Sequence, residues 1–378
     1  MLRNKIYNHI SYEFFRTFFI ILFAFTVIAW TVRAVYYLHL IVDDAYSIKT
    51  YAIYSILNLS NIITKFIPVS FLFSLILTIY QFKNKKEFLI LWCSGINKLS
   101  IVNLFTLISI IIIILNLLLS IIITPNSLNY SRTLLKSSDL NQVSAVIKQN
   151  DFTDTFQNIT FFVDEKIDNY KFKNIFIRDE TNSISGLIND KDSKDKTIIA
   201  KNGYVENNKL ILSDGIIHSS NGKEISSLKF KKTEITLNSL NNRTIQQPKL
   251  RETKTSTLYN CLFFKNDNLL NCPISKLKTE VLEHFSRRVS MPFYILMISL
   301  ICCFALFSNE EKENNSFKRY FVFIFSFITI IFSEILIRYT GKSELFAINY
   351  FLVPMLFSPI LYCLLIYKSQ KEKLLKVK

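Results

Sequence analysis

Half of the 378 residues are apolar, 34 are Phe, and the mean hydropathy is +0.27, which together argue against a single soluble globule. Only six Gly and seven Pro residues occur, which excludes collagen-like, Pro-rich and flexible-linker chains. The formal net charge of +16 would suit a nucleic-acid-binding protein, but the distribution of the charge along the chain argues against that class. The composition therefore indicates a membrane protein.

Six apolar segments are long enough to cross a membrane, which takes about 20 residues of helix. Three of them precede a long polar stretch and three follow it. The third segment has no charged residue and is the least ambiguous. The predicted spans are residues 14–40, 61–82, 99–124, 289–307, 320–337 and 348–367.

Lys and Arg gather in one set of short connections, and such connections stay in the cytoplasm. They are Arg3, Lys5, Arg16, Lys83, Lys85, Lys86, Lys98, Lys312, Lys318, Arg319, Lys368, Lys371, Lys373, Lys376 and Lys378. The opposite short connections contain Lys49 and Lys342. We therefore expect both termini in the cytoplasm and the polar stretch outside it, and the net charge needs no nucleic-acid partner. The first apolar run is too long for a cleavable signal peptide.

The polar stretch, residues 125–285, consists of short β-rich runs. Leu228 and Phe230 alternate with lysines, as in a half-buried strand. Glycine pairs that are typical of turns separate the runs: Asn202-Gly203, Asp214-Gly215 and Asn221-Gly222. The pattern predicts an all-β domain, either a sandwich, a jelly roll or an open sheet, inserted between the third and fourth spans. The predicted division is 1–124, 125–285 and 286–378. An accessory domain without chemistry is the alternative.

Signatures of catalysis are absent from the sequence. No glycines follow the GxxxxGK[ST] pattern that cradles nucleotide phosphates, the four histidines lack metal-ligand spacing, and no GxSxG motif occurs. The sequence therefore predicts a chain that is not an enzyme and holds no metal or cofactor. Among six cysteines, Cys261 and Cys272 lie in the polar stretch, where they could form a disulfide or remain unpaired thiols.

A short amphipathic helix is predicted at about 84–97, between the second and third spans. Its apolar residues have helical spacing: Phe88, Leu91 and Trp92. Gly95 is placed to end the helix in the left-handed conformation. Two interpretations remain. The helix lies on the bilayer surface, or it docks on a cytoplasmic partner, with Glu87 as the anion for a basic groove.

In these features the chain resembles the LptF/LptG permeases of the lipopolysaccharide export transporter. The resemblance covers the order of three spans, periplasmic β-jelly roll and three spans. It also covers two motifs, namely Glu87 followed by Cys93-Ser94-Gly95, and Arg287-Arg288 followed by Pro292 at the start of the fourth span. The segment 248–258, with Pro248 to Glu252 and then Thr257-Leu258, resembles the stretch leading to that start. Glu283 and His284 depart from the usual offset and are assigned no role.

The resemblance implies a permease of the cell inner membrane that extracts lipopolysaccharide and passes it through the β domain toward the outer membrane. It implies three kinds of protein partner: a homologous second permease, a dimer of a cytoplasmic ATPase that contacts the helix around Glu87, and a periplasmic bridge protein. Residues 32–44 and 149–152 resemble LptF more than LptG.

Charged residues inside the spans are further candidates for function, because an ion in a membrane is costly unless it is paired or faces a polar cavity. The resemblance implies that Arg33 contacts lipid A phosphates, and Lys65 is a weaker candidate. Arg33 snorkelling to the interface is the alternative. Glu334 and Arg338 are spaced i, i+4, which predicts an ion pair between them.

Two other classes of protein fit part of the pattern. A permease of another lipid or lipoprotein exporter would share the topology class but usually has four spans. A membrane sensor would also carry a periplasmic β domain, but it would normally add a cytoplasmic signalling domain.

Overall fold

The chain folds into two compact units, each with its own hydrophobic core. The membrane unit comprises Met1–Val32, Asn58–Leu128 and Lys249–Lys378, and the β unit comprises Arg33–Leu57 and Asn129–Pro248. The computed structural model describes residues 2–42, 46–139, 149–156, 159–168, 171–180, 195–206, 209–220, 225–236, 249–263, 275–307 and 315–377.

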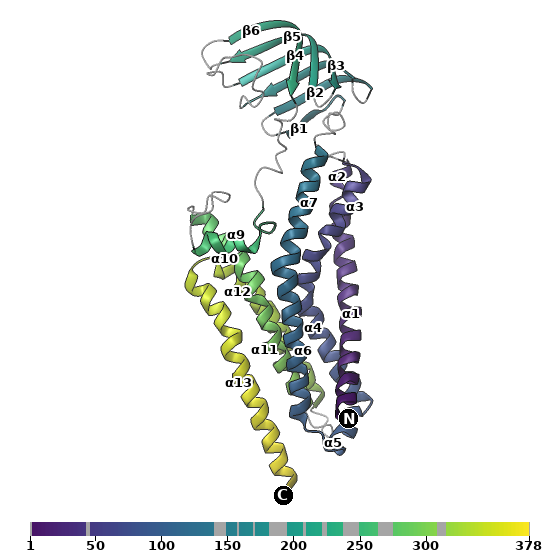
Figure 1. Cartoon of the computed structure of the whole chain (residues 1–378), viewed down its shortest axis with the longest axis vertical. Coiled ribbons are helices and arrows are strands. Elements are labelled where there is room, and N and C mark those ends of the chain that lie inside the picture. The colour runs from purple at the N-terminus through teal and green to yellow at the C-terminus, as the bar shows by residue number, and fades with distance from the viewer. Residues whose placement is uncertain are drawn as a thin grey trace. The chain divides into compact units, whose positions relative to one another are not determined.

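Within the described residues, six helical stretches are long and apolar enough to cross a membrane, as the sequence predicts. They are Lys5–Val42, Ile48–Asn84, Lys98–Leu135, Thr279–Phe307, Tyr320–Thr340 and Glu344–Lys371. An antiparallel sheet is inserted between the third and the fourth (Figure 1). The predicted fold class, six membrane helices with an inserted β domain, is thereby confirmed.

The helical elements keep the labels of Figure 1. Before the sheet they are α1 (Leu2–Tyr36), α2 (His39–Val42), α3 (Ile48–Leu57), α4 (Leu59–Asn84), α5 (Glu87–Cys93), α6 (Lys98–Leu118), the π-helix η1 (Leu119–Ile123) and α7 (Thr124–Asp139). After the sheet they are α9 (Thr255–Phe263), α10 (Ser275–Val289), the 3₁₀ turn η3 (Met291–Phe293), α11 (Tyr294–Cys303), the 3₁₀ turn η4 (Phe304–Phe307), α12 (Asn315–Thr340) and α13 (Glu344–Val377).

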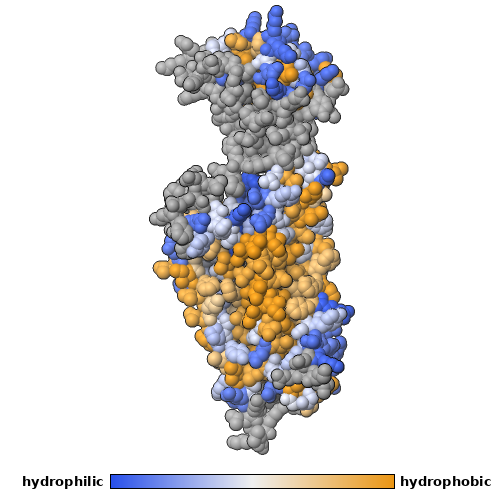
Figure 2. All heavy atoms as spheres, in the orientation of Figure 1, coloured by the Kyte–Doolittle hydropathy of each residue, from blue (hydrophilic) through white to orange (hydrophobic). Residues whose placement is uncertain are grey.

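The core of the membrane unit forms where α4, α6 and α11 pack together, and its largest buried side chains include Phe71 and Phe105. The helices α6 and α11 pack closely enough for a hydrogen bond between them, which Ser299 Oγ donates to the Phe105 carbonyl oxygen at 3.3 Å. Outward-facing side chains of the unit are apolar as well and form a broad band over its helices (Figure 2). An apolar exterior of this kind suits lipid or another helical subunit, not water.

The third span contains a π-helix. At η1 the Thr124 N–H donates to the Leu119 carbonyl oxygen, five residues back, and the helix then continues through α7. A π-helix inserts one extra residue into the turn. Pro125 follows in α7 and has no N–H, so the Ile121 carbonyl oxygen lacks the helical donor that the residue four positions on would normally supply.

The β unit contains one six-stranded antiparallel sheet in which the strands follow chain order. The strands are β1 (Phe152–Phe156), β2 (Ile159–Asp168), β3 (Lys171–Asp179), β4 (Asp195–Glu206), β5 (Lys209–Ser220) and β6 (Ile225–Thr236). Apolar side chains of one face form the core, among them Phe161, Ile177 and Leu212. Within the predicted β segment 125–285, the ends are helical, as α7, α9 and α10. Their amphipathic sequences lower the mean hydropathy, so composition alone did not separate them from the sheet.

Two glycine pairs predicted as turns lie inside strands instead, which corrects that prediction. Gly203 lies in β4 and Gly215 in β5. A Cβ at Gly203 would collide with the Ile175 side chain, so the glycine permits close packing within the sheet. Before Gly215, Asp214 has a left-handed φ of 55°, and the register of β5 with β4 and β6 continues unchanged past it. The third pair, Asn221-Gly222, lies outside the described residues.

Substitution of Gly215 tests this close approach. A Cβ there would collide with the Ile199 carbonyl oxygen and the Phe230 ring. We expect Gly215→Ala to destabilise the sheet by about 2 kcal/mol, because overpacking forces backbone shifts. Hydrogen exchange on the full chain should show lost protection of the β4 and β5 amides and unchanged protection in α6. Ser213→Ala on the same strand is the matched control. Equal protection in both variants would contradict the expectation.

Candidate functional site

A polar cavity of about 280 Å³ lies within the membrane unit. Figure 1 shows α10, which contributes to its lining, at the end of the helices opposite α5. Its walls come from α4, from the third span on both sides of η1, from α10, η3 and α12, and from the segment 249–255. The lining residues are Asn61, Thr64, Lys65, Asn116, Ser120, Thr124, Arg251, His284, Arg287, Arg288, Met291, Pro292, Glu334 and Arg338. Polar side chains of this density inside a membrane helix bundle mark a site for a polar ligand.

The lining carries a strong excess of positive charge. Among the described lining residues, five are Lys or Arg and one, Glu334, is a carboxylate. In a site of reduced dielectric such an excess attracts anions and repels cations. Two of the five cations, Arg287 and Arg288, form hydrogen bonds to other parts of the protein.

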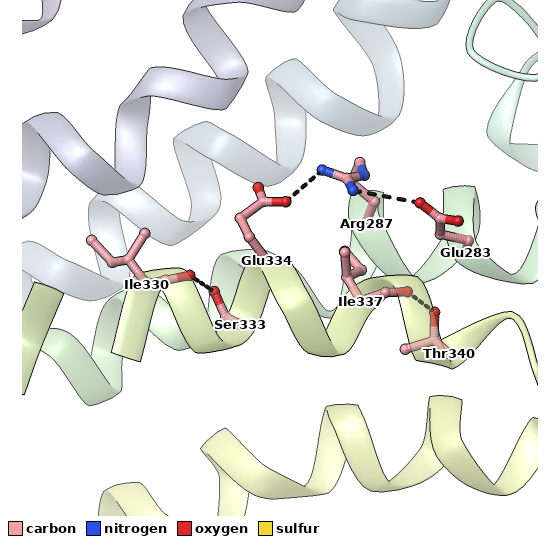
Figure 3. A network of polar contacts seen from close by, with 7 residues as sticks. All are labelled: Glu283, Arg287, Ile330, Ser333, Glu334, Ile337 and Thr340. Atoms are coloured by element: carbon pink, nitrogen blue, oxygen red, sulfur yellow. Dashed lines mark hydrogen bonds and ion pairs between the residues drawn. The ribbon is translucent and has the colours of Figure 1, made fainter. Parts of the chain in front are cut away.

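Arg287 is engaged by two carboxylates (Figure 3). Its Nη1 donates to Glu334 Oε2 at 2.9 Å, and its Nη2 lies 3.5 Å from Glu283 Oε1. The ion pair predicted between Glu334 and Arg338 is therefore wrong, because α10 brings Arg287 onto the α12 carboxylate first. Glu283, which the sequence left without a role, orients Arg287 from one turn earlier on α10.

Arg288 is engaged by neutral groups. Its guanidinium donates to the carbonyl oxygens of Leu250, Arg251 and Thr253 at 2.8 to 3.0 Å, and to Thr255 Oγ1 at 2.9 Å. The side chain is only 7% exposed. The two adjacent arginines of the family motif thus differ in kind, one being paired with carboxylates and the other serving as a clamp on the segment 249–255. Pro292, the third motif residue, is buried at the start of η3.

Three further cations line the cavity with exposed side chains, namely Lys65, Arg251 and Arg338. Neither Arg251 nor Arg338 forms an ion pair within the described part of the chain. Lys65, a candidate contact for lipid phosphates, therefore lines the same cavity as two arginines from distant segments of the chain. Arg33 is exposed on α1 and is not among the lining residues.

At the other end of the membrane unit, the predicted short helix is present as α5, Glu87–Cys93. Gly95 follows it with φ +88°, and the Ile96 N–H donates to the Leu91 carbonyl oxygen at 3.1 Å, so the predicted left-handed termination is confirmed. The apolar stripe packs inward, because Phe88 and Leu91 are buried in the core of the membrane unit. Trp92 stacks on Phe88 with 5.7 Å between ring centroids.

The outward surface of α5 is formed by Leu89 and Ile90, and not by the predicted apolar stripe, of which Phe88 and Leu91 are buried. Leu89 and Ile90 are 46% and 62% exposed. Glu87 is about a third exposed, and its carboxylate oxygens lie 3.7 Å from His9 Nε2 and 4.0 Å from Lys85 Nζ. The stripe of Phe88 and Leu91 therefore anchors α5 to its own bundle, and any partner or lipid meets Glu87, Leu89 and Ile90.

Sequence reasoning missed Arg251 and the polar residues of the third span as parts of one site. Asn116 and Ser120 interrupt a run that is otherwise almost wholly apolar, and that interruption was the available signal. Arg251 gave no such signal, since it lies in a polar segment. Cys261 is buried and disulfide-bonded, whereas Cys272 lies outside the described residues.

Comparison with known proteins bears on the whole chain. No individual curated protein matches it. A family model, described as the lipopolysaccharide export system permease LptF/LptG, matches residues 9–368. The match takes in the inserted sheet, the cationic cavity, α5 and the six membrane spans except for the outer ends of the first and the last. The chain therefore belongs to the LptF/LptG family of lipopolysaccharide export system permeases.

Proposed function

We propose that this chain is the LptF-type permease subunit that takes lipopolysaccharide from the inner membrane and passes it toward the outer membrane, driven by a separate cytoplasmic ATPase. The observation that carries the proposal, beyond family membership, is the cationic cavity in the membrane unit. The LptF-type assignment rests on residues 32–44 and 149–152, of which 43 and 44 lie outside the described residues.

The cavity suits the phosphate end of the lipid. Lys65, Arg251 and Arg338 supply charge-assisted donors from three separate segments, and a phosphate accepts several such hydrogen bonds at once. A volume of about 280 Å³ holds a phosphate and part of a sugar, not several acyl chains. The chains would lie outside the cavity on the apolar helix faces, where each buried CH₂ contributes about 0.8 kcal/mol. Arg33 on α1 would meet a second phosphate as the lipid arrives.

The short helix α5 is proposed as the contact for the ATPase. Its inward anchors, Phe88 and Leu91, join it rigidly to the core formed by α4 and α6. A force applied to Glu87, Leu89 or Ile90 would therefore move those spans rather than α5 alone. Trp92 and Gly95 fix the end of the helix.

The remaining partners follow from the same family system. We propose that a homologous second permease covers part of the apolar exterior, that both termini are cytoplasmic, and that the β unit is periplasmic and hands the lipid to a bridge protein. The excess of Lys and Arg on the α5 side supports this orientation.

Photo-crosslinking from the cavity tests the proposed headgroup site. A photoreactive amino acid would replace Met291, in the complex of this chain with its second permease and ATPase in nanodiscs loaded with lipopolysaccharide. We expect Lys65→Gln with Arg338→Gln to lower the crosslinking yield at least about tenfold, because two charge-assisted hydrogen bonds are lost. Lys342→Gln, an exposed lysine near the same helix end but outside the cavity, is the control.

Equal yields for the cavity variant and the control would reject the cavity as the headgroup site. An additional arm addresses Arg33. With the photoreactive residue moved onto α1, Arg33→Glu should lower the yield by reversing the charge that meets phosphate. An unchanged yield in that arm would favour snorkelling of Arg33 to the interface.

A further inference from the structure

The segment 249–255 connects the β unit to α9, and Arg288 clamps it onto the cavity. The four hydrogen bonds from the Arg288 guanidinium all end on residues 250 to 255 of this segment. One of them reaches the carbonyl oxygen of Arg251, whose side chain lines the cavity. The position of the Arg251 backbone is therefore set by the buried Arg288.

Thr255 extends this clamp to the third span. Its hydroxyl accepts from Arg288 Nη1 at 2.9 Å and donates to the Ile121 carbonyl oxygen at 3.0 Å. A hydroxyl has one proton to donate and lone pairs to accept, so both bonds form at the same time. Ile121 lies inside the π-helix η1, and the residue four positions further along is Pro125, which has no N–H to donate to the Ile121 carbonyl oxygen. The Thr255 hydroxyl donates to this carbonyl oxygen in place of the missing N–H.

The two hydrogen bonds of Thr255 end close to residues that line the cavity from two different segments. Ser120 and Thr124, next to Ile121, line the wall that the third span contributes, and Arg251 lines the wall that the segment 249–255 contributes. Thr255 thus joins two walls of the cavity through one hydroxyl group. A valine would fill nearly the same volume but would leave both the Ile121 carbonyl and Arg288 Nη1 short of a partner.

We propose that Thr255 and Arg288 are positioning residues of the headgroup site: they hold the segment 249–255 against the π-helix so that Arg251 faces the phosphate. The inference rests on the proposed function, because it presumes that the cavity receives a phosphorylated headgroup. Neither residue donates to the lipid itself. Both act through Arg251.

The test uses the same complex, with the photoreactive residue at position 291, and two probes: lipopolysaccharide with its lipid A phosphates, and the same lipid after dephosphorylation. We expect Thr255→Val to lower the yield with the phosphorylated probe about tenfold, to the level of Arg251→Gln. Thr255→Ser keeps the hydroxyl and should stay within about twofold of the unmodified chain. The yield with the dephosphorylated probe should be similar in all of these variants.

A double variant makes the assignment specific. If Thr255 acts through Arg251, Thr255→Val should have no further effect in the Arg251→Gln background, because coupled residues are not additive. Additive losses, or equal losses with both probes, would show that Thr255 only supports the fold and would overturn the proposal. If Thr255→Val does not assemble, Arg288→Lys replaces it, since lysine keeps the charge but cannot bridge four acceptors. That variant should show the same loss, confined to the phosphorylated probe.

The outcomes also separate this inference from the proposed function. A loss in Arg251→Gln without a loss in Thr255→Val or Arg288→Lys would overturn the positioning role and leave the headgroup site intact. Unchanged yields in Arg251→Gln and in Lys65→Gln with Arg338→Gln would reject the headgroup site and the positioning role together.

Discussion

Glu87→Ala is expected to lower recovery of the ATPase with this chain by well over tenfold and to lower lipid-stimulated ATP turnover in proportion. If Glu87 enters a basic groove of the ATPase, it loses the water that now reaches a third of its surface. Removing one member of a desolvated, hydrogen-bonded charge pair costs about 2 to 5 kcal/mol. Co-purification from membranes that contain the assembled complex measures the effect.

Two control variants separate the ATPase contact from contacts within the chain. Glu372→Ala removes a carboxylate from the end of α13 and should leave recovery unchanged. His9→Gln removes the internal neighbour of Glu87, whose ring nitrogen lies 3.7 Å from the carboxylate. A pair this exposed contributes at most about 1 kcal/mol, so His9→Gln should have little effect. Equal recovery for Glu87→Ala and Glu372→Ala would mean that α5 is not coupled through Glu87.

Arg287→Met is expected to destabilise the membrane unit by about 2 kcal/mol, because it leaves the carboxylates of Glu283 and Glu334 without their shared cation. The value is set below the roughly 3 to 5 kcal/mol of a broken buried pair, since Arg287 and Glu334 keep 27% and 41% of their side-chain surface accessible. Thermal unfolding of the complex in detergent, followed by loss of the assembled species, measures the change.

A double-mutant cycle shows whether the carboxylates cause this loss. Glu334→Gln in the Arg287→Met background removes one unpaired charge and should restore part of the stability. Arg338→Met is the matched control, because Arg338 lines the same cavity without an ion pair in the described part of the chain. If Arg338→Met destabilises as much as Arg287→Met, the effect is not due to the Glu283–Arg287–Glu334 network.

Features that a single stretch of chain satisfies were predictable from the sequence. Each membrane span meets its own backbone hydrogen bonds, so length and hydropathy are enough to find all six. The same holds for the end of α5, because Gly95 can adopt a left-handed φ that residues with a Cβ avoid. The alternating strands of the inserted sheet also follow a local pattern.

The residue pairs that end in glycine show that a local pattern is not always sufficient to predict a turn. Asn202-Gly203 and Asp214-Gly215 read as turns, yet both lie within strands. A glycine permits a tight turn and also permits a close approach by a neighbouring side chain, as at Gly203 beneath Ile175. The neighbouring strand decides between these uses, and it comes from another part of the sequence.

Only the tertiary structure decided what each cation near the fourth span does. Arg287 and Arg288 are adjacent and chemically identical, but successive residues on a helix point in directions about 100° apart. One therefore meets the Glu334 carboxylate of α12, and the other meets the carbonyl oxygens of the segment 249–255. Glu283, the second partner of Arg287, is only four residues away, but Glu334 and these carbonyl oxygens lie more than thirty residues away along the chain. No local spacing in the sequence encodes these distant partners. Which arginines stabilise the fold and which line the site is therefore determined only when the helices pack.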